Sequence, residues 1–111
     1  MDRIIAQVNF RYNCSESKMK EMASELQDEV QQVNGLLWKI WIQNDEKSLA
    51  GGIYYFENRE VAEAYINGPI GDEMRDHPDF WDLDVTYFDV MEGPSKGTNA
   101  PVFENDPGTG K

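Results

Sequence analysis

The sequence predicts an α+β fold with a ferredoxin-like βαββαβ order and an antiparallel sheet. Three observations carry this prediction. Apolar and polar residues alternate at 4–10 and again at 84–91, which is the period of a strand. An apolar stripe with helical spacing follows the first of these segments. Two runs rich in β-branched and aromatic residues, 36–43 and 52–56, flank a polar turn and predict a hairpin.

The first helix is expected to follow Ser17. Its apolar residues are spaced by 3, 1, 3, 4 and 3 positions and therefore share one face: Met19, Met22, Ala23, Leu26, Val30 and Val33. Ser15 or Ser17 is available as the N-cap, and Asn34-Gly35 provides the stop. The pattern predicts one amphipathic helix between the first strand and the hairpin.

The second half of the chain repeats the helix and strand signals. Asn58 can cap a second helix, which Gly68-Pro69 ends. The conformation of 70–83 stays open, because residues 72–76 favour a helical turn that His77-Pro78 then breaks. The fourth strand is expected at 84–91, and with it the ferredoxin-like order is complete.

The domain boundary is predicted near residue 91. Residues 1–91 hold every expected helix and strand and form a single domain of ordinary size. Residues 92–111 contain three of the five Pro, four of the nine Gly and only two sizeable apolar residues, Val102 and Phe103. We expect this tail to be flexible or to wrap around a partner surface.

Charge and composition exclude several classes of partner. The formal net charge of −11 repels phosphate backbones and anionic lipid surfaces, so neither nucleic acid nor a membrane is expected. The first residues lack the basic start and long apolar core of a signal peptide, which predicts a cytoplasmic protein. The single Cys14 excludes an internal disulfide and has no neighbouring Cys or His at metal-ligand spacing.

Both faces of the predicted sheet are apolar. In the second strand Leu36, Trp38, Ile40 and Ile42 alternate with a set that includes Leu37 and Trp41. The other strand of the hairpin and the fourth strand show the same two-sided pattern. Two short helices cover only one face, and the other would expose more apolar surface than monomers tolerate. The sequence therefore predicts a homodimer in which the sheets of two copies pack face to face.

Four blocks of sequence carry a resemblance to a known family. They are Gly35-Leu-Leu-Trp-Lys-Ile-Trp, Ala50-Gly-Gly-Ile-Tyr-Tyr-Phe, Ala62-Glu-Ala-Tyr and Tyr87-Phe-Asp-Val. Together, over residues 4–91, they resemble the YdhR-like putative mono-oxygenases of the dimeric α+β barrel superfamily. The resemblance implies a dimeric barrel and oxygenation of a hydroxylated aromatic or polyaromatic small molecule without a cofactor. The alternative is a non-catalytic dimeric protein of the same fold that binds a small molecule or another partner.

Oxygenation without a cofactor needs little from the protein. The substrate supplies the electrons, within apolar walls that carry a few donors for developing negative charge and an acceptor for its proton. The pocket candidates are aromatic or amide side chains of the predicted strands and helices: Asn9, Trp38, Trp41, Tyr54 and Tyr65. Each also suits an ordinary core or interface position. Trp38 and Trp41 are three residues apart and point to opposite faces, but the sequence leaves open which one faces the helices.

Other residues have a structural interpretation as well as a functional one. Trp41 can lie over bare backbone if it pairs with Gly51 or Gly52. Lys39 either extends its stem to an edge, pairs with Asp89, stacks on a ring or anchors an anionic substrate. The single histidine, His77, fits a surface loop better than a catalytic base or a haem ligand. The acidic residues of 72–84 lack a calcium-loop pattern and are expected to be solvated, and no metal site is predicted.

Overall fold

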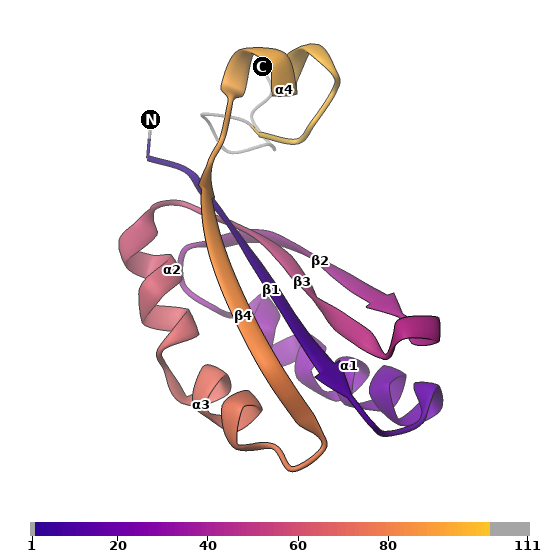
Figure 1. Ribbon diagram of the computed structural model, residues 1–111. Coiled ribbons are helices and arrows are strands. Elements are labelled where there is room, and N and C mark those ends of the chain that lie inside the picture. Colours follow the sequence, from indigo (N-terminus) through magenta and orange to yellow (C-terminus); the bar gives the residue numbers. More distant parts are fainter. Residues whose placement is uncertain (1, 103–111) are drawn as a thin grey trace.

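The computed structural model describes residues 2–102 as a four-stranded sheet with the α-helices between residues 16 and 76 on one face (Figure 1). The elements follow one another as β1 (Ile4–Tyr12), α1 (Glu16–Gln31), β2 (Leu36–Asn44), the 3₁₀ turn η1 (Asp45–Lys47), β3 (Leu49–Phe56), α2 (Arg59–Ile66), α3 (Pro69–Asp76), β4 (Phe80–Asp89) and α4 (Glu92–Gly97). The spatial order β2-β3-β1-β4 has every neighbouring pair antiparallel. This arrangement confirms the predicted ferredoxin-like fold.

Helices α1 and α2 begin where side chains satisfy free backbone N–H groups. The Ser15 hydroxyl accepts a hydrogen bond from the Lys18 N–H at 3.1 Å, and the Asn58 side chain accepts one from the Val61 N–H at 2.9 Å. α1 ends at Gln31, before the predicted stop, and Gly35 then takes a φ of +86° to turn the chain into β2. Local capping signals therefore place both helices largely as the sequence predicts.

The segment 70–83 resolves into a helix and the start of the last strand. Pro69 occupies the first turn of α3, where its missing N–H costs nothing, and His77 ends that helix. β4 begins at Phe80, earlier than the predicted start at Asp84. Within this first part of the strand, Asp82 has a φ of 56°, and the register against β1 shifts there. This bulge hides the strand from a strict alternation pattern.

A second bulge changes the predicted faces of β2. The register shifts between Leu36 and Trp38, so Leu36 packs on the helix-side core while Trp38 pairs with Tyr55 on the opposite face. The prediction that Leu36 and Trp38 share a face is therefore wrong, because the extra residue interrupts the two-residue period. Beyond the bulge, Lys39 and Trp41 lie on the helix side.

The main core lies between the centre of the sheet and α2. It consists of buried apolar side chains: Ile4, Ala6, Val8, Tyr54, Phe56, Ala62 and Ile66. A smaller cluster of Phe10, Tyr12 and Ala50 lies toward the other end of β1. Alternate residues of β1 and β3 thus point at the helices, as the strand period requires.

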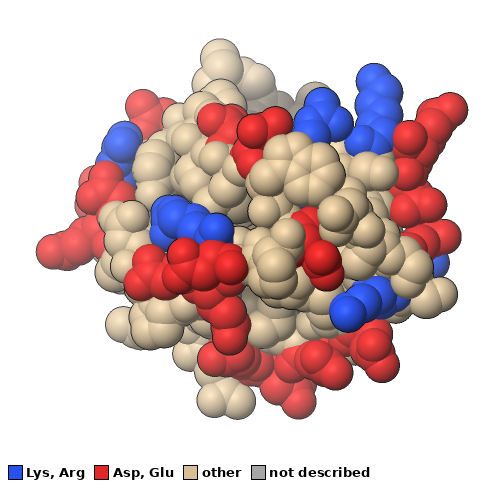
Figure 2. Space-filling model, turned by 60° about the horizontal axis from the view of Figure 1, so that its bottom comes forward, with Lys and Arg blue, Asp and Glu red and all other residues tan. Residues whose placement is uncertain are grey.

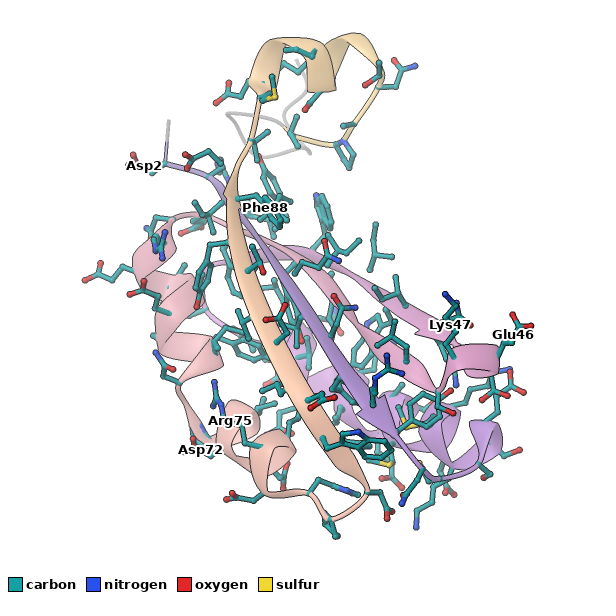
Figure 3. All side chains as sticks on the ribbon, viewed as in Figure 1. Asp2, Glu46, Lys47, Asp72, Arg75 and Phe88 are labelled. Atoms are coloured by element: carbon teal, nitrogen blue, oxygen red, sulfur yellow. The ribbon has the colours of Figure 1, made fainter. Side chains whose placement is uncertain are left out.

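The opposite sheet face, which we call the open face, carries large apolar side chains in contact with solvent. Ile40, Trp81 and Phe88 are 51%, 45% and 47% exposed. Figure 3 shows Phe88 on the upper part of β4, on the side away from α2 and α3, whereas Arg75 and Asp72 form an ion pair of 3.6 Å on α3. Two-sided apolar character is therefore a property of the folded sheet as well as of its sequence.

Residues 92–102 return to one end of this open face. α4 lies beyond the end of β4 (Figure 1), and the chain after it brings the Pro101 carbonyl within 3.1 Å of Trp38 Nε1, which donates a hydrogen bond to it. Val102 is buried. The rest of the predicted tail, 103–111, lies outside the described residues. In the described part, no helix is long and apolar enough to cross a membrane.

Candidate functional site

A cavity of about 200 Å³ lies between the helix side of the sheet and the helices α1 and α3. Its sheet wall is formed by Val8, Phe10, Lys39, Trp41, Gln43, Ala50, Tyr54 and Phe80. Its helix wall is formed by Met19, Met22, Ala23, Leu26, Tyr65, Ile70 and Met74. Most of this lining is aliphatic or aromatic, and a few polar groups converge on it, as in small-molecule sites generally.

The cavity exists because α1 does not close on the sheet along its whole length. Of the apolar stripe of α1 only Val30 is buried, at the end of the helix nearest β2. Met19, Met22 and Leu26 remain partly exposed and line the cavity instead. The flexible methionine side chains here are suited to adapt to ligands of different shape.

The Lys39 side chain lies along the sheet wall of the cavity, against two aromatic rings. Its Nζ lies 3.4 Å from the centre of the Trp41 ring and 4.5 Å from that of Tyr54. Its stem passes over Gly52, where an added Cβ would come within 2.6 Å of the Lys39 Cε. Burial lowers the pKa of Lys39 to about 7, while the two ring faces favour its charged form.

The glycine opposite Trp41 has a different use from the one predicted. Trp41 does pair with Gly52 in the β2–β3 register, so the condition for an indole that lies over bare backbone is met. The nearest side-chain atoms over Gly52 belong to Lys39 and Tyr54, however, so the lysine stem occupies the space predicted for the indole. Trp41 remains 38% exposed at the rim of the cavity.

Two tyrosine hydroxyls meet at the deep end of the cavity. The Tyr54 and Tyr65 oxygens are 3.5 Å apart, and their rings pack at 5.4 Å. Burial, and then the neighbouring Tyr65, raises the pKa of Tyr54 well above its usual value, and burial also raises the pKa of Tyr65. Both groups therefore stay protonated at neutral pH, and because one hydroxyl donates to the other, one O–H remains available as a hydrogen-bond donor.

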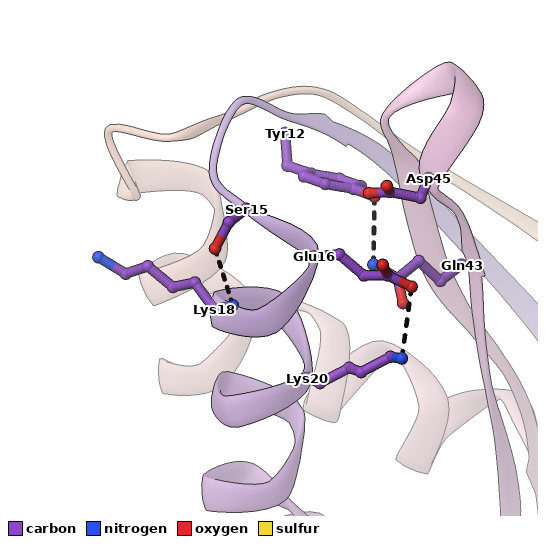
Figure 4. A network of polar contacts seen from close by, with 7 residues as sticks. All are labelled: Tyr12, Ser15, Glu16, Lys18, Lys20, Gln43 and Asp45. Atoms are coloured by element: carbon purple, nitrogen blue, oxygen red, sulfur yellow. Dashed lines mark hydrogen bonds and ion pairs between the residues drawn. The ribbon is translucent and has the colours of Figure 1, made fainter.

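A polar network borders the cavity where β1 and β2 end near the start of α1 (Figure 4). Tyr12 donates a 2.8 Å hydrogen bond to the Asp45 carboxylate and accepts one of 3.2 Å from Gln43 Nε2. On α1, Lys20 forms a 3.3 Å ion pair with Glu16. Gln43 and Lys20 both line the cavity, so this network forms its polar edge.

The structure brings three of the five pocket candidates together. Trp41, Tyr54 and Tyr65 line the cavity. Asn9 and Trp38 do not, since Asn9 pairs with Gly51 and Trp38 with Tyr55 on the open face. There the Asn9 side chain accepts a hydrogen bond from Gln7 at 3.1 Å, and the Trp38 ring stacks on Tyr55 at 5.1 Å.

Several lining residues were not among the candidates. Met19, Met22, Met74 and Phe80 belong to elements whose apolar residues look like ordinary core from the sequence. The sequence feature that points to the cavity is Lys39, a charged residue between two Trp on a strand that is apolar on both faces. The alternative that Lys39 pairs with Asp89 is wrong, because these residues lie on opposite edge strands, β2 and β4. The alternative that it stacks on a ring is confirmed.

His77 lies at the end of α3 and outside the cavity lining. Its ring stacks on Phe80 at 4.1 Å, and its Nδ1 accepts a hydrogen bond from the Asp79 N–H at 3.1 Å. Within residues 2–102, no group of three or more His, Cys, Asp or Glu is placed to hold a metal ion. The acidic residues of α3 are exposed, as predicted.

Solved structures of similar shape have low sequence identity. SnoaB, a cofactor-independent oxygenase from Streptomyces nogalater, has a TM-score of 0.66 and 8% identity, covering 81% of this chain and 94% of its own. A protein titled a putative antibiotic biosynthesis monooxygenase, from Deinococcus radiodurans, has a TM-score of 0.63 and 12% identity, with coverage of 80% and 93%. A heme-degrading protein from Mycobacterium tuberculosis has a TM-score of 0.57 and 13% identity, with coverage of 82% and 94%.

These likenesses show the fold alone, because the fold hosts different chemistries. No curated protein sequence matches the chain. A family model does match, over residues 5–101, and it is described as "Putative mono-oxygenase ydhR". That match covers both walls of the cavity and the returning segment after α4. The chain therefore belongs to the ydhR family.

Proposed function

We propose that this chain is a cofactor-independent mono-oxygenase of a hydroxylated aromatic small molecule, and that the cavity is its active site. The observation that carries the proposal is an apolar cavity, walled by Trp41 and Phe80, into which a lysine and two protonated tyrosines project. The family match supports the reaction class. The cavity volume of about 200 Å³ is below the roughly 300 Å³ of the smallest typical ligand pockets, which favours ligands of few rings.

The reaction balances without a protein-bound electron carrier. At a ring methylene activated by a neighbouring phenolate or enolate, one oxygen atom of O2 replaces two hydrogens to give a carbonyl. The second oxygen atom leaves with these hydrogens as water, and the substrate supplies all four electrons. The chain's own contribution is to exclude water, orient the rings and donate a hydrogen bond from the Tyr54–Tyr65 hydroxyl pair to a developing oxyanion.

Oxygen uptake tests this proposal. With a panel of reduced phenols of one to three rings, including anthrone, the protein is expected to consume one O2 per carbonyl formed, with no flavin, haem or metal added. Heat-denatured protein is the control for spontaneous oxidation. If folded protein consumes no O2 above the buffer rate with any member of the panel, and yet binds these phenols unchanged, the chain is the non-catalytic binding protein instead.

We further propose that two copies pair through the open face. Ile40, Trp81 and Phe88 expose large apolar areas on this face, and a second sheet would remove them from water. The segment that ends in Pro101 and Val102 already covers one end of the face within the same chain. The second copy would then occupy the part that this segment leaves free.

Light scattering tests the pairing. Wild-type protein at micromolar concentration is expected to have twice the mass of one chain, and Phe88→Lys is expected to shift it to the single-chain mass, because a charge cannot be buried in an apolar interface without a partner. Met91→Lys is the matched control, since Met91 is 72% exposed and lies after the end of β4. A wild-type protein that stays a folded monomer would refute the pairing.

A further inference from the structure

We propose that the cavity selects aromatic ligands that carry an acidic oxygen, a phenolate or a carboxylate, and that Lys39 forms the ion pair with that oxygen. The inference rests on the proposed use of the cavity as a ligand site, but it is independent of oxygenation. It names a charge requirement and the residue that imposes it.

The charge inside the cavity is opposite to that of the protein as a whole. The chain has 21 acidic and 10 basic residues, and Figure 2 shows acidic side chains spread widely over the face in view. The described lining of the cavity contains no Asp or Glu and two lysines, Lys39 and Lys20. An anionic ligand is therefore repelled by the net charge of the protein and attracted by the local charge of this cavity.

Lys39 is the cation that the sheet wall presents to a ligand. None of the ion pairs given for residues 2–102 includes it, whereas Lys20 is 68% exposed in its side chain and already paired with Glu16. The Lys39 ammonium instead lies over Trp41 and beside Tyr54. A ligand ring stacked in the cavity would bring its acidic oxygen to an unpaired, half-buried charge.

The neighbouring groups reinforce this selection. β3 contributes the Tyr54 hydroxyl and α2 that of Tyr65, and this pair has one O–H left to donate to a ligand. α3 contributes only apolar side chains, Ile70 and Met74. On α1 the charged groups at the edge are the Glu16–Lys20 pair, with Glu29 acting on Tyr65 from farther along the helix.

Proton balance follows from the chemistry of the pair. A carboxylate binds the ammonium form of Lys39 without proton transfer. A neutral phenol passes its proton from its oxygen to the neutral amine, which gives the same phenolate–ammonium pair. Burial lowers the pKa of Lys39 in the unliganded protein to about 7. The affinity for a carboxylate is therefore expected to be full below pH 7 and to fall as the pH rises above it. Ion pairing in turn raises the pKa of Lys39 in the complex.

Calorimetric titration with 2-naphthoate and its methyl ester tests the proposal, because the two probes share their rings and differ in charge. Wild-type protein is expected to bind the naphthoate at least tenfold more tightly at pH 6.5, which is about 1.4 kcal/mol. Lys39→Met is expected to abolish this preference. Lys20→Met, the matched control, is expected to change it less than threefold, since Lys20 is exposed and paired.

A second variant tests position rather than charge. Gly52→Ala puts a Cβ 2.6 Å from the Lys39 Cε, so the lysine side chain must move while its charge stays in the protein, and the preference is expected to fall severalfold. Equal affinity of wild type for both probes, or a preference that survives Lys39→Met, overturns the proposal even if oxygen uptake is observed. A Lys39-dependent preference without oxygen uptake upholds it and refutes only the oxygenase function.

Discussion

Gly51→Ala is expected to lower the free energy of unfolding by about 3 kcal/mol. A Cβ at Gly51 would lie 1.8 Å from the Val8 carbonyl oxygen and 3.0 Å from the Asn9 Cα. Both atoms belong to the backbone of β1, which pairs with β3 at the centre of the sheet, so no rotamer change relieves the overlap. The two strands must separate, and hydrogen bonds of the ladder are lost. Urea unfolding followed by circular dichroism measures the change.

Gly93→Ala is the matched control for this prediction. Gly93 lies in α4, and a Cβ there would meet nothing within 4 Å. The same substitution should leave stability unchanged or raise it slightly, because alanine favours the helix. Equal unfolding midpoints for wild type and Gly51→Ala would contradict the packing of β1 against β3 as described.

Ala23→Phe is expected to weaken binding of two-ring phenols at least tenfold while the protein stays folded. Ala23 lies on the cavity side of α1, and the cavity measures only about 200 Å³. A benzyl group at this position would occupy the space that a ligand ring needs. Titration calorimetry with 2-naphthol measures the loss, and thermal unfolding checks that the larger side chain is accommodated.

Ala64→Phe provides the same substitution outside the cavity. Ala64 is exposed on α2 and does not line the cavity, so affinity for 2-naphthol should change less than twofold. If Ala23→Phe and the wild type bound the phenol equally, the ligand would have to bind elsewhere. The open face, with Trp81 and Phe88, would then be the next place to look.

The sequence predicts the order of elements well because the local signals agree. The alternation of β1, the apolar stripe of α1 and the caps at Ser15 and Asn58 each specify one structure. β4 and β2 depart from the prediction at their bulges. A single extra residue, at Asp82 or after Leu36, reverses the faces of its neighbours, and nothing in a two-residue pattern announces it.

The site is less accessible to sequence reasoning than the fold. Trp41, Tyr54 and Tyr65 are on the list of candidates because aromatic and hydroxyl groups suit the chemistry, and they do line the cavity. Whether Trp38 or Trp41 faces the helices depends on the register of the hairpin, which only the folded sheet defines. Their role in catalysis stays a prediction.

The cavity between α1 and the sheet is the feature that is hardest to predict from the sequence. Met19, Met22 and Leu26 have the spacing of a packed helix face, and the same pattern would describe a solid core. Only the distance between α1 and the sheet distinguishes a core from a cavity, and the spacing of apolar residues does not encode that distance. Lys39, the charged residue of the opposite wall, is of a type that conflicts with a solid core.

NMR of selectively labelled methionine methyl groups tests the central claim, that the cavity between the sheet and α1 binds the aromatic ligand. Met19, Met22 and Met74 line the cavity, whereas Met91 is 72% exposed outside it and serves as an internal control. On titration with 2-naphthol, the resonances of the three cavity methionines are expected to shift together with one dissociation constant, and that of Met91 to stay in place. Shifts confined to Met91, or no shift at saturating ligand, would contradict the account.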